Sequence, residues 1–405
     1  MKAEVIAIGS ELLLGQIVDT NSAVIARHLA GIGLDLFYKT TVGDNLGRLT
    51  ATLRQALARS DVVITTGGIG PTADDVTREA VAAATERELV FDENLMGQIE
   101  TFFASRGMRA SPSNRRQAYM PAGAIAIENP VGTAPAFIVE HRSTTVITLP
   151  GVPREMEHLL VSRVIPYLHG RLGIRGEIRL RVVKTVGIGE SPIGELLADF
   201  MEKGANPTVG TLAHLGQVDV RIAAKADDPE SAARLIAPVE TEVRARLGEA
   251  VFGADEATLE GEVAARLRAA NTRAALAELG SAGLASGRLA AAAPGQFAGA
   301  VVLSEPADAE RLGVDLGASG TAEERARALA TAVAKWAGAG VGAAVCLEPS
   351  PETSPPATRV SVAVATDSQR DAREYRFGGD LLSIRIRAAT LVLDLIRRVL
   401  PREAS

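Results

Sequence analysis

The sequence is almost without cysteine and has few histidines. Its 405 residues include a single cysteine, Cys346, and five scattered histidines. A lone cysteine excludes an internal disulfide and favours a reducing compartment. A zinc site built from Cys and His ligands at regular spacing is excluded as well. Neither kind of cross-link is therefore expected to stabilise the fold.

Long apolar runs and a leader segment are also missing. The N-terminal residues enter a strand-like run directly, without the apolar stretch of a signal peptide. The most apolar later stretch, residues 284–303, is interrupted by Arg288, Pro294 and Gln296 and is too broken to span a bilayer. These features predict a cytoplasmic protein that has no membrane partner.

An excess of positive charge is absent. The 43 basic residues face 49 acidic ones, which leaves a net charge of −6. This balance argues against direct binding of nucleic acid. The apolar share of 47% and the charged share of 23% are typical of globular proteins, and the length allows two or three domains. No segment repeats with a period of 20 to 50 residues, so a solenoid is excluded.

Strand-like and helix-like segments alternate in the region 1–170. Buried strands are expected at 5–8, 36–41, 62–66 and 145–148, with helices between them. This alternation predicts βαβ units in a mostly parallel, doubly wound α/β sheet. A small α+β module is expected at 175–253, and an alanine- and glycine-rich α/β domain at 257–402. Within the latter, the proline-rich segment 348–358 predicts a loop.

The strongest local feature is a glycine-rich loop at 67–75 that follows the third strand directly. At the carboxyl end of a parallel strand, glycines let backbone N–H groups approach an anion, and the next helix adds partial positive charge. Thr72 adds a hydroxyl. Asp74 and Asp75 would repel a bare phosphate, so they suit a divalent cation that bridges to it. The structural alternative is a glycine turn followed by acidic residues that favour a helix N-terminus.

Two further loops end neighbouring strands. Gly9, Ser10 and Glu11 follow the first strand, and Asp44 follows the second. Ligands bind at such strand ends in open α/β sheets, so these loops are expected to meet the glycine loop in one crevice. Asp19 and Asn21, slightly later, are expected to cap a helix.

The segment 114–137 is long and polar, which within a compact domain usually indicates function. Asn114, Arg115 or Arg116 could contact phosphate, and Gly132 with Thr133 could approach a ribose or base. The alternative is an exposed loop with solvated arginines. Arg154 and Glu155 open a helix near the same edge and could either face the ligand or pair with each other.

These motifs together resemble the CinA family of competence/damage-inducible proteins. The matching segments are Gly9–Gly15, Asp19–Asn21, Val42–Asn45, Gly67–Thr77, Asn129–Pro135, Leu149–Met156, Gly187–Ser191 and Asn206–Ala213. The resemblance implies an N-terminal domain of the molybdopterin-cofactor-biosynthesis type (MogA-like) and a KH-like middle module. In this family the N-terminal domain acts as a metal-dependent ADP-ribose pyrophosphatase that yields AMP and ribose 5-phosphate.

The resemblance implies a role for each motif. The expected catalytic residues are Asp44, Asp74 and Asp75, which with Glu155 would hold the metal. The expected phosphate and nucleotide ligands are Gly9, Ser10, Glu11, Gly67, Gly68, Gly70, Thr72, Asn114, Gly132 and Thr133. The expected cofactor is Mg²⁺, Co²⁺ or Mn²⁺, with an assisting K⁺ left open. The expected partner is the small-molecule substrate ADP-ribose, and the expected assembly is a homodimer.

The C-terminal part departs from the family pattern. Complete CinA proteins end in a nicotinamide mononucleotide amidohydrolase domain of the PncC type, whose nucleophile lies in the segment Ala-Glu-Ser-Cys-Thr-Gly-Gly. The aligned segment here, 277–283, has Leu279 at the serine position, and Leu279 has no nucleophilic atom. Ser281 lies two residues away. Two other active-site segments also differ, at 303–305 and 346–351, so we expect a retained fold without this activity.

Two other functions stay open at this level. The same N-terminal fold binds molybdopterin in cofactor-biosynthesis proteins, so the chain could bind a pterin without hydrolysis. Alternatively, the whole chain could be a scaffold or regulator linked to competence, with the degenerate C-terminal domain serving dimerisation. Alanine-rich helices without a site suit that role, but they suit plain core packing equally well.

Overall fold

The computed structural model describes residues 1–174, 176–202, 206–316, 321–350 and 357–401. The chain divides into two compact units, 1–179 with 224–234, and 180–223 with 235–405. No helix in the described ranges is long and apolar enough to cross a membrane.

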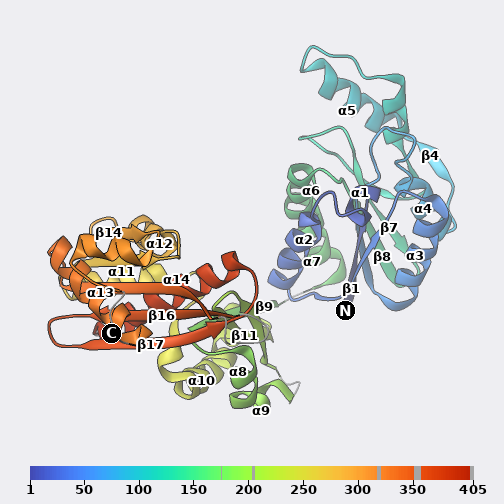
Figure 1. The fold of residues 1–405 in the computed structure, drawn as a ribbon. Helices are drawn as coiled ribbons and strands as arrows, with labels where there is room; N and C mark the ends of the chain where they lie inside the picture. Colours follow the sequence, from blue (N-terminus) through green and yellow to red (C-terminus); the bar gives the residue numbers. More distant parts are fainter. Residues whose placement is uncertain (175, 203–205, 317–320, 351–356, 402–405) are drawn as a thin grey trace. The chain divides into compact units, whose positions relative to one another are not determined.

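The first unit is built on a six-stranded sheet with the order β2-β1-β3-β8-β7-β6 (Figure 1). Its strands are β1 (Lys2–Ile8), β2 (Asp35–Val42), β3 (Val62–Thr66), β6 (Ile125–Ile127), β7 (Ala136–His141) and β8 (Thr144–Leu149). The first four strands in this order run parallel, whereas β7 runs antiparallel to both of its neighbours, β8 and β6. The prediction of a mostly parallel sheet is confirmed.

Helices cover both faces of this sheet. They are α1 (Ser10–Leu13), α2 (Thr20–Gly31), α3 (Leu46–Arg59), α4 (Thr77–Ala84), α6 (Pro153–Leu159), the π-helix η2 (Leu160–Val164) and α7 (Ile165–Leu172). On one face Ile25 and Leu159 pack against Ile64, and on the other Leu53 packs with Ile6. Because successive strand residues point to opposite faces, the continuous apolar strands fill two cores at once.

A smaller lobe projects beside the sheet. It consists of β4 (Leu89–Phe91), α5 (Glu93–Ala104), η1 (Pro112–Ala118) and β5 (Tyr119–Pro121), where β4 pairs with β5. Leu95 and Ile99 of α5 pack on Ala118 and Met120. The long polar segment 114–137 has regular structure over much of its length, in η1, β5, β6 and the start of β7, so the alternative of an exposed loop does not describe it.

The module that follows has a four-stranded sheet with the order β10-β11-β9-β12. Its elements are β9 (Glu177–Val186), α8 (Glu190–Leu196), α9 (Ala198–Glu202), β10 (Thr208–His214), β11 (Gln217–Ala226), α10 (Pro229–Leu247), η3 (Gly248–Ala250) and β12 (Val251–Ala254). Alternating Val218, Val220 and Ile222 in β11 are buried. This is the α+β arrangement expected from the sequence.

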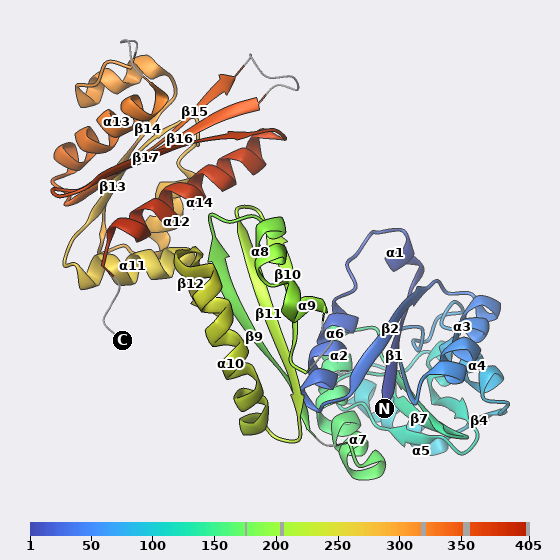
Figure 2. The same ribbon diagram turned by 90° about the horizontal axis from the view of Figure 1, so that it is seen from below.

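The last part is a five-stranded sheet with the order β14-β13-β15-β16-β17. Its elements are α11 (Leu259–Ala269), β13 (Ala274–Leu279), α12 (Leu284–Ala292), β14 (Phe297–Leu303), η4 (Pro306–Leu312), α13 (Ala322–Ala337), β15 (Val341–Ser350), β16 (Ala357–Ala365), β17 (Arg370–Phe377) and α14 (Leu381–Val399). Figure 2 shows α13 on one face of this sheet and α14 on the other. An apolar core lies between the sheet and each of these helices.

Both ends of the proline-rich segment 348–358, expected to be a loop, are strand. Residues 348–350 end β15, and 357–358 begin β16. The two strands pair along their length, with Glu348 opposite Arg359. The residues between them, 351–356, lie outside the described ranges, and so does the last residue of the segment 346–351.

Candidate functional site

The loop after β3 can be formed only by glycine at its first two positions. Gly67 and Gly68 have φ values of +106° and +64°. A Cβ on Gly67 would collide with the carbonyl oxygen of Ile8, and one on Gly68 would collide with Oγ1 of Thr77. The glycines therefore let the loop pass directly over the end of β1 and the start of α4.

One backbone amide of this loop donates a hydrogen bond within the fold, and in the part of the chain that the structure describes the next three do not. The amide of Gly67 donates to the carbonyl of Leu149 at 3.1 Å, which continues the β3–β8 ladder. Within the described ranges we find no acceptor for the amides of Gly68, Ile69 and Gly70. Gly67 was expected to bind phosphate, but its amide is already engaged, so the anion cradle reduces to the next three residues.

Two residues that the sequence reasoning missed hold the loop in place. The guanidinium of Arg78 is buried and donates to the carbonyl oxygens of Ile69 and Gly70. Burial lowers its pKa to about 10. The hydroxyl of Thr77 donates to the carbonyl of Gly67 at 2.9 Å. With these carbonyls tied down at the start of α4, the amides of Gly68, Ile69 and Gly70 are the groups of the loop left without an acceptor in the described ranges.

The acidic pair lies beside the cradle. The amide and hydroxyl of Thr72 both donate to Oδ2 of Asp75, at 2.8 and 2.6 Å, and this carboxylate also lies against Gly70. The pKa of Asp74 is lowered, first by hydrogen bonding from Thr72 and further by the charge of Arg116. Arg116 itself pairs with Glu79 at 3.0 Å. Thr72 therefore orients the carboxylate of Asp75, and its hydroxyl also favours the charged form of Asp74.

The loops after β1 and β2 meet as the sequence predicted. The amide of Ser10 donates to Oδ2 of Asp44 at 2.7 Å, and the amide of Asp44 donates back to the Ser10 hydroxyl at 3.3 Å. The carboxylate of Glu11 folds over Gly9, where any side chain would displace it. These four residues form one connected edge at the carboxyl ends of β1 and β2.

Asn21 ties the start of α2 to the ends of β3 and β8 and is not the helix cap that was expected. Its amide nitrogen donates to Thr66 at 3.0 Å and to the carbonyl of Gly151 at 2.8 Å, while Asp19 caps α2 through Ser22. The buried Oδ1 of Asn21 has no hydrogen-bond partner in the described ranges. It lies on the wall of a small cavity of about 110 Å³ that Glu11 also lines.

Glu155 approaches from the opposite side. Its carboxylate fills the space where Gly132 lacks a Cβ, and it accepts a hydrogen bond of 2.6 Å from Asn129. Burial raises the pKa of Glu155, and the bond from Asn129 offsets part of that rise. Arg154 is not needed to hold Glu155, because Asn129 and Gly132 already fix its position.

Asn114 is buried in a structural network. It accepts from the amide of Ser111 and donates to Gln117, which in turn donates to Thr133 at 3.3 Å. Asn114 therefore supports Thr133 from behind. Arg115, the other arginine considered for phosphate, stacks on the ring of Phe91 at 4.0 Å.

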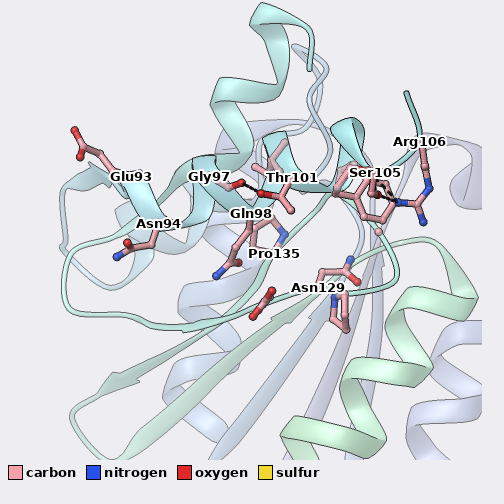
Figure 3. Close-up of a pocket in the computed structure, with 15 residues that line it drawn as sticks. Glu93, Asn94, Gly97, Gln98, Thr101, Ser105, Arg106, Asn129 and Pro135 are labelled. Carbon is pink, nitrogen blue, oxygen red and sulfur yellow. Dashed lines mark hydrogen bonds between the residues drawn. The ribbon is translucent and has the colours of Figure 1, made fainter. Parts of the chain in front are cut away.

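Gly132 and Thr133 line a larger cavity of about 750 Å³ between α5 and the segment 128–135 (Figure 3). Asn129 lies on the same wall and joins this cavity to Glu155. The sequence had no signal for the opposite wall, because the polar face of α5 looks like an ordinary exposed helix surface.

The expected metal ligands are oxygen donors, which suit a hard divalent cation. In the described part of the chain, however, no three Asp, Glu, His or Cys side chains lie together as a ligand cluster. Asp44, Asp75 and Glu155 each accept hydrogen bonds from protein groups instead. Magnesium is often held by one or two carboxylates together with substrate phosphates, and this donor set fits that mode.

The C-terminal part has no exposed nucleophile where the family pattern has one. Leu279 ends β13 and is buried. The hydroxyl of Ser281 is fully buried and donates to Glu278 at 2.6 Å, and Glu278 also accepts from the amide of Ser286 at 2.7 Å. Burial raises the pKa of Cys346 to about 12, so this thiol is not a nucleophile either.

Known proteins match this chain along its length. Families described as "Probable molybdopterin binding domain", "Damage-inducible protein CinA KH domain" and "CinA C-terminal domain" match residues 4–170, 180–253 and 256–400. A "Putative competence-damage inducible protein" of Caldicellulosiruptor saccharolyticus is 38% identical over 414 residues, which cover 99% of each chain. A "CinA-like protein" of Kosmotoga olearia is 36% identical over 410 residues, again 99% of each. A crystal structure of CinA "with unknown function" from Thermoplasma acidophilum is 39% identical and covers 40% of this chain and 94% of that one, with a TM-score of 0.38.

Proposed function

Because the chain belongs to the CinA family of competence-damage inducible proteins, we propose that its N-terminal part hydrolyses ADP-ribose to AMP and ribose 5-phosphate. The observation that carries this proposal is the anion cradle. Three unused backbone amides, at Gly68, Ile69 and Gly70, lie next to paired carboxylates at the carboxyl edge of the sheet. Such a cradle suits a phosphate, and the adjoining carboxylates suit a reaction on a phosphorylated ligand.

The chain's own groups have separable tasks in this reaction. The three amides bind the oxygens of one phosphate and stabilise the charge that develops on it. Thr72 keeps the carboxylate of Asp75 in place beside Gly70. Ser10 holds the carboxylate of Asp44 at the end of β2, and Asn21 holds Thr66 at the end of β3, next to the cradle.

A divalent cation is part of the proposal. Asp44, Asp74, Asp75 and Glu155 would hold it together with the diphosphate of the substrate, since the four carboxylates alone form no closed cluster. When bound, Mg²⁺, Co²⁺ or Mn²⁺ neutralises charge on the diphosphate and polarises its phosphorus–oxygen bonds.

The test is incubation of the purified protein with ADP-ribose and each of the three cations, followed by chromatographic detection of AMP. Asp74→Ala should lower turnover by at least about a hundredfold, as expected for loss of a group that acts on the transition state. Glu100→Ala, which removes an exposed carboxylate of α5, should leave turnover unchanged. Full activity of Asp74→Ala, with an unchanged thermal unfolding curve, would sink the assignment.

A second candidate function is binding of molybdopterin without hydrolysis. It is favoured by the match of residues 4–170 to a family described by molybdopterin binding. A titration with a pterin beside that incubation separates the two, because tight binding of the pterin with no release of AMP supports the binding function.

We further propose that the C-terminal part lacks nicotinamide mononucleotide amidohydrolase activity. Leu279 stands at the nucleophile position, and the Ser281 hydroxyl is sequestered by Glu278. Purified protein incubated with nicotinamide mononucleotide should release no ammonia above the uncatalysed rate. Ammonia release that follows enzyme concentration would refute this part of the proposal.

A further inference from the structure

The five-stranded sheet of the C-terminal part has two edges that differ in charge. β14, at one edge, reads Phe-Ala-Gly-Ala-Val-Val-Leu and contains no charged residue and no proline. β17, at the other edge, has five charged residues among its eight, Arg370, Asp371, Arg373, Glu374 and Arg376. An edge strand exposes unpaired backbone N–H and C=O groups, and charged residues or prolines commonly keep it from pairing with another strand. β17 is protected in this way, and β14 is not.

The outer side of β14 is open in the described part of the chain. All residues of the neighbouring β13 are buried, whereas each residue from Phe297 to Val302 is at least partly exposed. A register shift between Ala274 and Ala275 affects only the start of β14, and residues 299–303 pair with β13 without interruption. Apart from this ladder, we find no hydrogen bond to the backbone of residues 298–303 in the described ranges. A regular stretch of strand is therefore left with an unpaired edge.

Two large apolar side chains flank this edge, one on each face of the sheet. Trp336 of α13 lies over Gly299, where an added Cβ would come within 3.3 Å of its ring, and it is 55% exposed. Val302 lies on the other face, beside Gly283 at the start of α12, and is 50% exposed. Tryptophan is highly buried on average and is enriched at protein–protein interfaces. Both side chains would lose contact with water if another strand lay along β14.

We propose that β14 pairs with β14 of a second copy of this chain, antiparallel and across a twofold axis, so that two five-stranded sheets continue as one. The twofold axis makes two identical strands antiparallel, and the unpaired donors of one edge then meet the acceptors of the other. The edge is thus complementary to itself, whereas a charged partner would find no charge on β14 to recognise.

The apolar side chains fit the same symmetry. A twofold axis perpendicular to the sheet brings Trp336 of both copies onto one face of the joint and Val302 of both copies onto the other. Each face of the joint is therefore apolar on both sides, and the small residues Ala298, Gly299 and Ala300 leave room for the two strands to approach. The homodimer expected from the sequence has its interface here, whether or not ADP-ribose is hydrolysed.

Sedimentation velocity of the full chain over about 1–100 μM measures the dimer. The unchanged protein should form a dimer whose share rises with concentration. Val302→Lys places a charge at the edge of each copy and should raise the dissociation constant of the dimer by about tenfold or more. Val161→Lys is the matched control, because Val161 is 48% exposed but belongs to η2 in the first unit. Its dissociation constant should equal that of the unchanged protein.

Trp336 is the only tryptophan of the chain, so its fluorescence reports on this edge directly. Its emission should move to shorter wavelength as the concentration rises, because pairing removes water from the ring. Val302→Lys should keep the long-wavelength emission over the same range, and Val161→Lys should follow the unchanged protein.

A variant in another element guards against a folding defect. Trp336→Lys alters α13 and leaves the strand unchanged, and it should weaken the dimer as Val302→Lys does. The far-ultraviolet circular dichroism of both variants should match that of the unchanged protein, and if Val302→Lys does not fold, Trp336→Lys decides alone. An unchanged protein that stays monomeric at every concentration would overturn the proposal. A dimer that both variants leave intact, or that Val161→Lys weakens equally, would overturn it as well, because its interface would then lie elsewhere.

Discussion

Gly67 and Gly68 are required in the loop after β3 because a side chain at either position would collide with neighbouring atoms. Gly68 is in the left-handed region, and a Cβ there would collide with the hydroxyl of Thr77, which itself holds the loop through Gly67. The polar face of the cradle therefore depends on the absence of one carbon atom.

Gly68→Ala should accordingly lower the free energy of unfolding by about 1–3 kcal/mol, the usual cost of forcing extra volume into a packed site. It should also lower turnover of ADP-ribose. The matched control is Gly170→Ala in α7, where a Cβ meets nothing within 4 Å. There the better helix propensity of alanine should stabilise the protein by about 0.5–1 kcal/mol. Urea unfolding measures both changes in the free energy of unfolding. If Gly68→Ala were as stable as the unchanged protein, the predicted collision with Thr77 would be wrong.

The role of a residue could be predicted from the sequence only where that residue belongs to a recognisable motif. The meeting of Ser10 with Asp44 follows from parallel strands that end at one edge, and it was predicted. Arg78 was missed because an arginine in the first turn of a helix is usually solvated, and nothing local indicates that its guanidinium turns back to two carbonyls. The engagement of the Gly67 amide depends on the register of β3 against β8, which no local pattern reveals.

At the scale of elements, the long buried segments were the predictable ones. The strand expected at 62–66 and the helix expected before it are present as β3 and α3. The short strand β6 was not predicted. It has only three residues, two of them exposed, which is too few to show the alternation of buried and exposed residues that is typical of a strand. Its pairing with β7 covers only three residue pairs, so it leaves no pattern in the sequence.

The contribution of a charged helix cap to stability can be tested by changing the pH. Asp380 caps α14, and its pKa is lowered by hydrogen bonds from the side chain and backbone of Ser383. A lowered carboxyl pKa stabilises the fold above the unfolded-state pKa, and this contribution disappears as the pH falls through the folded-state value. Asp380→Asn should therefore destabilise the protein at pH 7 and have progressively less effect toward pH 3. Urea midpoints across this range check the sign. A difference that is constant with pH would show that the charge of Asp380 contributes nothing.

At the scale of the whole chain, three parts were expected at 1–170, 175–253 and 257–402. The contact pattern gives two compact units, and most of the middle module belongs to the second of them with the C-terminal part. The side chains that join these parts explain the grouping. Arg397 of α14 is 1% exposed and donates both to Asp394 and to the carbonyl of Glu249 in η3. Gly187, at the end of β9, leaves room for the same Asp394.

Arg397→Met should therefore destabilise the second unit as a whole by about 3 kcal/mol, since it leaves a buried acceptor and part of a buried ion pair without a partner. Asp394 keeps Arg398 at 2.7 Å, so the loss should stay below that of a fully isolated buried charge. Arg398→Met is the control. Arg398 is more exposed than Arg397, and besides Asp394 it pairs only with the exposed carboxylate of Glu249 in the described ranges. Its loss should lower the free energy of unfolding by about 1 kcal/mol or less. Calorimetry of the full chain should show the transition of the second unit moving down in Arg397→Met while that of the first unit stays in place. If instead only residues 257–401 lost stability and the module 180–253 unfolded as before, the two parts would be independent domains after all.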